Sequence, residues 1–107
     1  MNQPDDAMLT PTALPFEALK RHNSQGVEYW SARDLQPCLG YSQWRDFKNA
    51  VKKAIKSCRQ SGNNAQNHFA DALKMVSIGS QTDRGLEDYH LSRFACYLIA
   101  QNGDPSF

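Results

Sequence analysis

The most regular feature of the chain is an apolar stripe within residues 42–60. Apolar side chains recur there at steps of three and four residues, at Trp44, Phe47, Val51, Ala54, Ile55 and Cys58. This spacing is typical of one buried face of an α-helix, and it continues for about four turns. We therefore predict a helix that Ser42 caps and that ends at the turn residues 61–64.

The segment that follows the N-terminal region predicts a short helix and then a strand. Phe16 and Leu19 lie at helical spacing within residues 16–23, and the turn residues 23–26 end this helix. Residues 27–30 are β-branched and aromatic, which favours a short strand.

A second helix is predicted directly before the long one. Ser31 and Asp34 have the spacing of a capping box, in which the two side chains satisfy free N–H groups of the first turn. We expect a helix that ends at Gly40 and that Pro37 shortens or kinks. The turn at Gly40 and Tyr41 gives a pair of helices that resembles a helix-turn-helix, although its apolar positions do not match the strict motif.

The last third of the chain predicts a β-hairpin and a closing helix. After a single helical turn within residues 65–69, we predict strands at 74–78 and 86–90 with a loop at 79–85 between them. A closing helix begins at Leu91 and has a buried face formed by Phe94, Ala95, Leu98 and Ile99.

These elements predict one small α+β domain behind a tail. Residues 1–14 contain Pro4 and Pro11 and have no apolar period, so we expect a disordered tail there. The domain then covers residues 15–107. A chain of 107 residues is one domain in size.

Composition excludes several classes of protein. The longest apolar run, residues 94–100, is far shorter than the roughly 20 residues that cross a bilayer, so no membrane span is expected. The N-terminus lacks the basic and apolar regions of a secretory signal, which favours a cytoplasmic location. The three cysteines have unrelated spacings and are expected to be reduced thiols.

The basic residues are concentrated in the long helix. Residues 42–60 contain six basic residues and only one acidic residue, Asp46, whereas the whole chain has a net charge of +1. On the helix, five of the six form one row beside the apolar face, at Arg45, Lys48, Lys52, Lys56 and Arg59. The row has no evident acidic partner on its own helix. It therefore predicts a nucleic-acid-binding surface, and the alternative is a solvated helix face.

Other residues near this row are candidates for contact with DNA. Ser42 and Gln43, with Arg45, lie where a recognition helix reaches base edges, and Arg33 and Lys53 are outlying basic candidates. Four aromatic residues cluster near the two helices, at Tyr29, Trp30, Tyr41 and Trp44. Some of them must lie in the core, and any exposed one would offer a stacking surface to single-stranded bases.

No catalytic or metal site is predicted. The three histidines and three cysteines lack the spacings of a metal site, and no phosphate-binding glycine motif is present. The cluster of Glu87, Asp88 and His90 is expected to be structural, capping the following helix and pairing with Arg84 or Arg93. We expect neither an enzyme nor a bound cofactor.

Several segments carry a family resemblance. They are residues 16–17, 20–23, 29–35, 39–41, 61–62 and 87–105, together with Trp44, Phe47 and Cys58. These segments resemble the DNA-damage-inducible protein D (DinD) family, and the Leu39-Gly40-Tyr41 corner is shared with the N-terminal domain of BRO-type viral and phage antirepressor proteins. The resemblance implies a bacterial, cytoplasmic, non-enzymatic protein of the SOS response. It also implies action on DNA and on recombinase filaments formed on single-stranded DNA.

The resemblance also implies a longer parent protein. Family members continue past residues 102–105 into a second helical region, so this chain is expected to be one domain or a shortened gene product. The alternative function is an antirepressor-like protein-interaction module without direct DNA binding. In it, the apolar face of the final helix would pair with a second copy or with a recombinase subunit. The sequence leaves the choice between single- and double-stranded DNA open.

Overall fold

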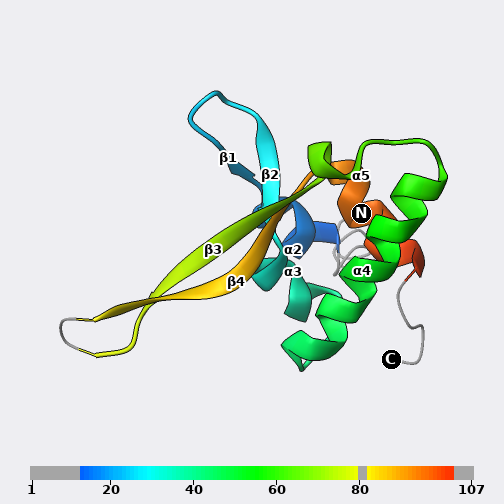
Figure 1. Ribbon diagram of the computed structural model, residues 1–107. Helices are drawn as coiled ribbons and strands as arrows, with labels where there is room; N and C mark the ends of the chain where they lie inside the picture. The colour runs from blue at the N-terminus through cyan, green and yellow to red at the C-terminus, as the bar shows by residue number, and fades with distance from the viewer. Residues whose placement is uncertain (1–12, 80–81, 103–107) are drawn as a thin grey trace, which may run out of the picture.

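The computed structural model describes residues 13–79 and 82–102, which form the α+β domain that the sequence predicts (Figure 1). In chain order the elements are α2 (Ala13–Ala18), β1 (Arg21–His22), β2 (Glu28–Ser31), α3 (Ala32–Cys38), α4 (Trp44–Gln60), the 3-10 turn η1 (Ala65–Asn67), β3 (Phe69–Ser77), β4 (Asp83–Leu91) and α5 (Arg93–Asn102). The four strands form one antiparallel sheet in the order β1-β2-β4-β3. No helix in the described residues is long and apolar enough to span a membrane.

The β3–β4 hairpin extends far beyond the rest of the sheet. Its register runs from Phe69 opposite Leu91 to Ser77 opposite Asp83. By contrast, β2 pairs with β4 only at the inner end, through Trp30 and Ser31. The outer part of the hairpin, residues 73–77 and 83–87, therefore projects from the domain as an arm (Figure 1).

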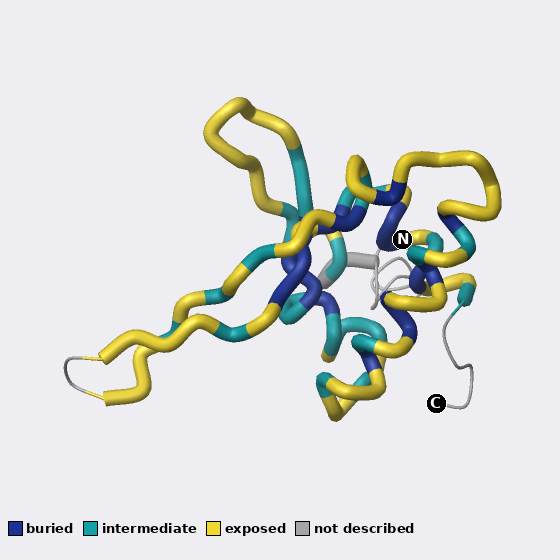
Figure 2. The backbone as a smooth tube through the Cα atoms, in the orientation of Figure 1, coloured by how far each residue is buried: buried dark blue, intermediate teal, exposed yellow. Residues whose placement is uncertain are grey.

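The hydrophobic core lies where the inner end of this hairpin meets the helices. Buried residues gather there, whereas most of the arm is exposed (Figure 2). Trp30, which is fully buried, stacks on Phe16 with ring centroids 4.5 Å apart and donates its indole N–H to the Phe16 carbonyl oxygen at 2.8 Å. The core also takes residues from both long helices, among them Phe47, Val51, Ala54 and Ile99.

The long basic helix is confirmed as α4, but its predicted cap is wrong. Phe47, Val51, Ala54 and Cys58 are fully buried along one face, as the apolar stripe indicates. The N-cap residue is Gln43 rather than Ser42, and the Gln43 side chain makes no capping hydrogen bond. Ser42 lies one residue too early and is exposed.

Helix α3 is also confirmed, but the predicted capping box does not form. Ser31 is the N-cap residue, yet its hydroxyl donates to Asp88 Oδ2 at 2.6 Å. The Arg33 backbone N–H donates to Asp88 Oδ1 at 3.0 Å, so a carboxylate of β4 caps this helix. Asp34 instead accepts hydrogen bonds from Arg21 and Lys74. A partner distant in sequence has replaced the local one.

The first predicted helix is misplaced. Helix α2 ends at Ala18, and Arg21 and His22 form β1, which pairs with Tyr29 and Glu28. The turn between the strands is built by Asn23, whose side-chain oxygen accepts the N–H groups of residues 25 and 27. This turn closes a small hairpin in place of the last helical turn. Residues 13–14, assigned to the tail, lie in α2, and residues 1–12 lie outside the described residues.

The second hairpin is confirmed with longer strands than predicted. β3 begins at Phe69 instead of residue 74, and β4 begins at Asp83 instead of residue 86. Cross-strand pairing extends the strands through Ala, Asp and Gly residues of low strand propensity. The closing helix α5 begins at Arg93, because Leu91 belongs to β4 and the Ser92 hydroxyl accepts the Ala95 N–H at 3.0 Å.

Candidate nucleic-acid interface

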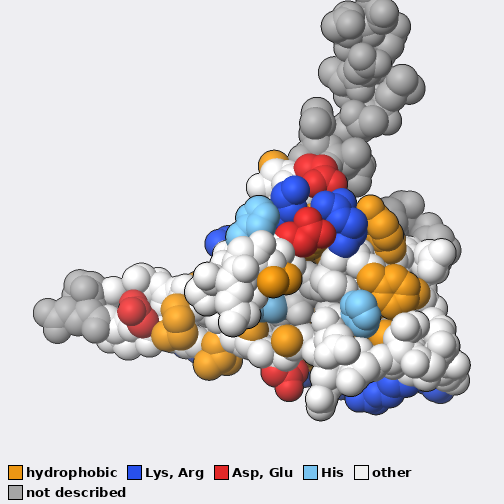
Figure 3. All heavy atoms as spheres, turned by 90° about the horizontal axis from the view of Figure 1, so that it is seen from above, with side chains coloured by type: hydrophobic (Ala, Val, Ile, Leu, Met, Phe, Trp, Pro, Cys, Tyr) orange, Lys and Arg blue, Asp and Glu red, His pale blue; other side chains and the backbone are white. Residues whose placement is uncertain are grey.

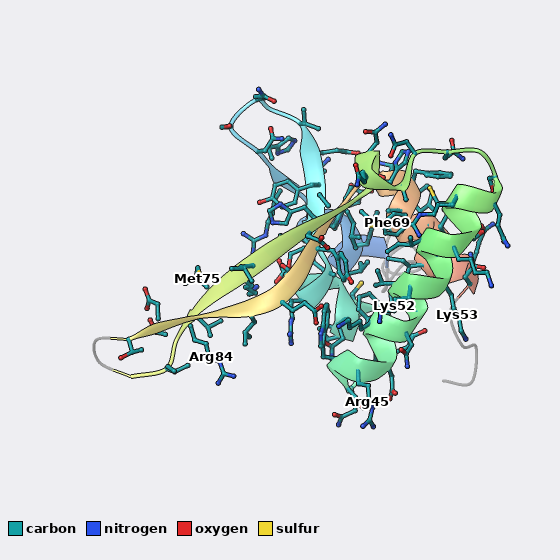
Figure 4. The ribbon with its side chains drawn as sticks, viewed as in Figure 1. Arg45, Lys52, Lys53, Phe69, Met75 and Arg84 are labelled. Atoms are coloured by element: carbon teal, nitrogen blue, oxygen red, sulfur yellow. The ribbon has the colours of Figure 1, made fainter. Side chains whose placement is uncertain are left out.

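The predicted basic row lies along one side of α4 beside the sheet. Arg45, Lys52, Lys56 and Arg59 are exposed, and Lys48 is half-buried. Lys53, the outlying candidate, is also exposed but points away from the sheet, about 100° around the helix from Lys52 (Figure 4). The structure therefore keeps the row together and separates Lys53 from it.

The row borders a groove between α4 and the inner end of the hairpin. A pocket of about 340 Å³ opens there between Lys52, Lys56 and Arg59 on one side and η1, β3 and β4 on the other. The opposite wall includes Gln66, Asp71 and Tyr89. Three cations thus face one carboxylate across this pocket. In the described part of the chain, Lys52, Lys56 and Arg59 form no ion pair.

Sequence reasoning missed the far wall of the groove. Asp71 and Gln66 come from segments that follow α4, and only the tertiary fold brings them to the basic row. Strand alternation from Phe69 would have put Asp71 on the core-facing side of β3. No local signal indicated that this side meets α4.

The start of α4 is held by one acidic side chain of the arm. Glu87 accepts a hydrogen bond from the Trp44 indole at 3.2 Å, and its other carboxylate oxygen lies 2.8 Å from Lys48 Nζ. These contacts lower the pKa of Glu87, chiefly through the Lys48 hydrogen bond, and the same hydrogen bond raises the pKa of Lys48. The row therefore has an internal acidic partner after all, and it comes from β4 instead of α4.

Arg33 belongs to the same cluster. Its Nε donates to the Glu87 carbonyl oxygen at 2.7 Å, and its guanidinium lies 3.9 Å from the centre of the Trp44 ring. Trp44 is thereby covered on one face. Arg33, Lys48 and Trp44 are thus committed to contacts within the domain, and the unpaired charge of the row is concentrated in Lys52, Lys56 and Arg59.

The base-reading candidates lie at the exposed beginning of α4. Ser42, Gln43 and Arg45 are all exposed, and Arg45 lies 3.9 Å from Asp46. The linker between α3 and α4 comprises residues 39–43 and turns at Gly40, whose φ of +87° favours glycine. The four aromatic candidates all lie in packed positions: Trp30 is buried, and Tyr29, Tyr41 and Trp44 are half-buried.

The acidic cluster of β4 is structural, with partners other than those predicted. Asp88 caps the preceding helix α3 instead of α5, and Glu87 pairs with Lys48. Arg93 binds Glu17 and Glu28, at 2.8 and 3.0 Å. No group of three or more His, Cys, Asp or Glu side chains suited to a metal occurs among the described residues. Burial raises the pKa of Cys38 and raises that of Cys96 to about 12, which leaves both thiols protonated at neutral pH.

The face of α5 that the alternative function requires is open only in part, because Ala95 and Ile99 are buried and Leu98 is half-buried, whereas Phe94, which was predicted to be buried, is 38% exposed. Ala95, Cys96 and Ile99 are buried in the core. Among the apolar residues of α5, Phe94 and Tyr97 are the ones with large exposed side chains. The larger apolar exposure lies on the arm, at Leu73 and Met75.

Comparison with known proteins agrees with the sequence resemblance. The model of the BRO family, N-terminal domain, matches residues 19–107. The chain is 49% identical over 92 residues to DNA damage-inducible protein D of Escherichia coli (strain K12), and the match covers 86% of the chain and 34% of that protein. The chain thus spans about a third of the curated relative that it matches. No solved structure matches. The resemblance is confirmed, and the chain belongs to the BRO family as an N-terminal domain related to DNA damage-inducible protein D.

Proposed function

We propose that this domain binds nucleic acid without catalysis, through the groove side of α4, as part of a bacterial DNA-damage-response protein. The observation that carries the proposal is the trio of Lys52, Lys56 and Arg59, which border one groove and have no ion-pair partner among the described residues. Cations held in a row repel one another, and a phosphate backbone relieves that repulsion while it releases counterions.

The geometry supports phosphate contact more than base reading. The three cations lie along the helix, and Arg45 extends the row past the partnered Lys48. Phosphate contacts set affinity and carry no sequence information. Ser42 and Gln43 are the residues of this surface that could contribute to base selection, because their polar side chains are exposed at the start of α4.

The test is a titration with fluorescent single-stranded and duplex oligonucleotides of random sequence, followed by anisotropy at several salt concentrations. The double variant Lys52→Glu, Lys56→Glu should bind both probes more weakly. If the two lysines each contact one phosphate, the slope of log affinity against log salt should fall by roughly two. Both side chains are exposed, so the fold should be unchanged in circular dichroism.

Lys53→Glu is the matched control. Per lysine replaced, it makes the same charge change on the same helix, on the side that points away from the sheet (Figure 4). It should retain most of the affinity. Equal losses per replaced lysine in the two variants would show that net charge alone sets the affinity. Unchanged affinity in the double variant would show that the groove does not bind nucleic acid.

We extend the proposal to recombinase filaments on single-stranded DNA. The support is the family resemblance over residues 16–105, which implies action on such filaments; the name of the 49% identical relative, DNA damage-inducible protein D, adds only that this relative is induced by DNA damage. The chain covers only 34% of that relative, so the expected partner contact involves the whole protein. Adding the domain and the full-length relative to preformed filaments, and measuring filament loss, tests which of the two acts. The bacterial cytoplasm, where such filaments form, is the proposed location.

A further inference from the structure

Strand β3 is an edge strand with exposed apolar side chains. It is the last strand in the sheet order, and among the described residues only β4 pairs with it. Leu73 and Met75 are 66% and 61% exposed, on the same face of the strand. Apolar side chains can be seen along the arm, at the left of Figure 3. Along the nine residues of β3, every second residue therefore points its backbone N–H and C=O groups away from β4, where another strand could pair with them.

Proline and a bulge, two of the usual protections against strand pairing, are absent from this edge. Residues 69–77 contain no proline, and their pairing with β4 is continuous, without a bulge. A lysine that points outward commonly guards such an edge. Here Lys74 is folded back, with its Nζ 2.6 Å from Asp34 Oδ1. Its charge is therefore partly offset by Asp34, a carboxylate that it shares with Arg21.

Charge argues against nucleic acid as the partner of the arm. The arm contains Lys74 and Arg84 against Asp83 and Glu87, which gives no net charge. Phosphate binding needs an excess of cations, and the excess lies on α4. The exposed apolar pair instead indicates a protein partner.

The side-chain pattern of β3 identifies that partner. We propose that two copies of this chain pair antiparallel through β3, with Lys74 opposite Lys74 of the other copy. In this register Leu73 lies opposite Met75, Ala72 opposite Val76, and Asp71 opposite Ser77, each pair occurring twice. Apolar side chains face apolar ones, and a carboxylate faces a hydroxyl.

The neighbouring registers of this strand pair place apolar side chains opposite polar ones. Side chains that oppose each other must lie on the same face, so the register can shift only in steps that keep odd residues opposite odd ones. With Leu73 opposite its own copy, Met75 would face Asp71. With Met75 opposite its own copy, Leu73 would face Ser77 and Lys74 would face Val76. The strand is therefore self-complementary in one register.

This pairing places both α4 helices on the same side of one continuous sheet. The odd residues of β3 share a face with Glu87, which binds Lys48 of α4. Antiparallel partners present the same face to the same side, so the odd faces of the two copies coincide. The dimer would carry two basic grooves on one surface, related by a two-fold axis. The pairing itself does not depend on what the grooves bind.

The first test is sedimentation equilibrium of the 107-residue chain over about 5 to 500 μM, because interfaces below roughly 1,200 Å² are usually weak. We expect a reversible monomer–dimer equilibrium. Leu73→Lys and Met75→Lys should each raise the dimer Kd by about tenfold or more. Val27→Lys is the control, because Val27 is also apolar and 57% exposed but lies outside β3.

The second test fixes the register by disulfide trapping. Leu73→Cys and Met75→Cys chains, mixed and oxidised, should form a disulfide-linked heterodimer, whereas each variant alone should not, because a cysteine would then lie opposite Met75 or Leu73. Lys74→Cys should crosslink by itself. A chain that stays monomeric throughout the range overturns the proposal. So does a dimer that Leu73→Lys and Met75→Lys leave intact, or crosslinking without this selectivity.

Discussion

Replacement of Asp88 should lower the free energy of unfolding more than the loss of one small polar side chain usually does, because Asp88 makes two hydrogen bonds to other elements. Asp88 is 3% exposed and holds two donors, the Ser31 hydroxyl and the Arg33 backbone N–H. Asp88→Ala removes the cap of α3, which costs about 0.5–2 kcal/mol. It also leaves the Ser31 hydroxyl, in a residue 5% exposed, without its acceptor, at about 1–3 kcal/mol. The expected loss is about 1.5–5 kcal/mol, a large part of a small domain's stability.

The assay is urea denaturation of both proteins, followed by far-ultraviolet circular dichroism and by tryptophan fluorescence. Trp30 is buried, so its emission reports loss of the core. The two signals should change together, at a lower midpoint and with an unchanged slope.

Asp88→Asn removes the negative charge of residue 88 but keeps an oxygen that can cap α3, so it measures the two effects separately. The amide keeps one oxygen that can accept the Arg33 N–H, and the Ser31 hydroxyl can rotate to accept from the amide nitrogen. This variant should lose about 1 kcal/mol, because hydrogen bonds to a neutral amide are weaker than hydrogen bonds to a carboxylate. A loss below about 0.5 kcal/mol for Asp88→Ala, the usual range of surface substitutions, would refute the structural role assigned here.

Three further predictions concern the packing of the core, the stability of the domain at low pH and the reactivity of the thiols. Ile99→Ala, at a fully buried position, should cost about 2–5 kcal/mol in thermal or urea unfolding, and a cost under about 1 kcal/mol would mean that α5 is not packed in the core. Burial alone would raise the pKa of Asp34, but hydrogen bonds from Lys74 and Arg21 outweigh it and lower the pKa below 3.8. The unfolded chain then binds the proton first, so this contribution to stability is present above about pH 4 and is lost as the pH falls through the folded pKa. Unfolding midpoints between about pH 2 and 6 should therefore drop less steeply for Asp34→Asn than for the parent chain, and parallel curves would contradict this. With a pKa raised to about 12 by burial, Cys96 should resist thiol reagents at pH 8 until urea unfolds the domain, and rapid labelling of Cys96 in the native protein would contradict its placement.

The sequence predicted the features that depend on local patterns. The stripe from Trp44 to Cys58 predicted α4, because a helix that buries one face repeats its apolar residues at steps of three and four. The resemblance of residues 87–105 predicted the family. The basic row could be placed on one side of α4 for the same reason as the stripe.

The errors arose where a distant partner replaced a local one. Ser31 and Asp34 have the spacing of a capping box, but Asp88, 57 residues after Ser31, takes the hydroxyl. Arg21 follows a helical pattern, yet its segment joins a strand that forms only beyond Gly26. The pairing of Lys48 with Glu87 was equally invisible, because it depends on how the hairpin lies on α4. Such long-range pairs decide which of several local options is used.

The contacts at the base of the arm have a mechanical consequence. Lys74 ties one face of the hairpin to α3 through Asp34, and Glu87 ties the other face to α4 through Lys48. Ion pairs thus hold both faces of the hairpin near residues 74 and 87, and the part of the hairpin beyond these residues has no such contact among the described residues. Amide hydrogens should exchange slowly from the inner end of the hairpin to residues 74 and 87, and quickly from there toward residues 77 and 83. A partner that binds the far end of the hairpin and moves it would therefore act on α3 and α4 together, through the ion pairs Lys74–Asp34 and Glu87–Lys48.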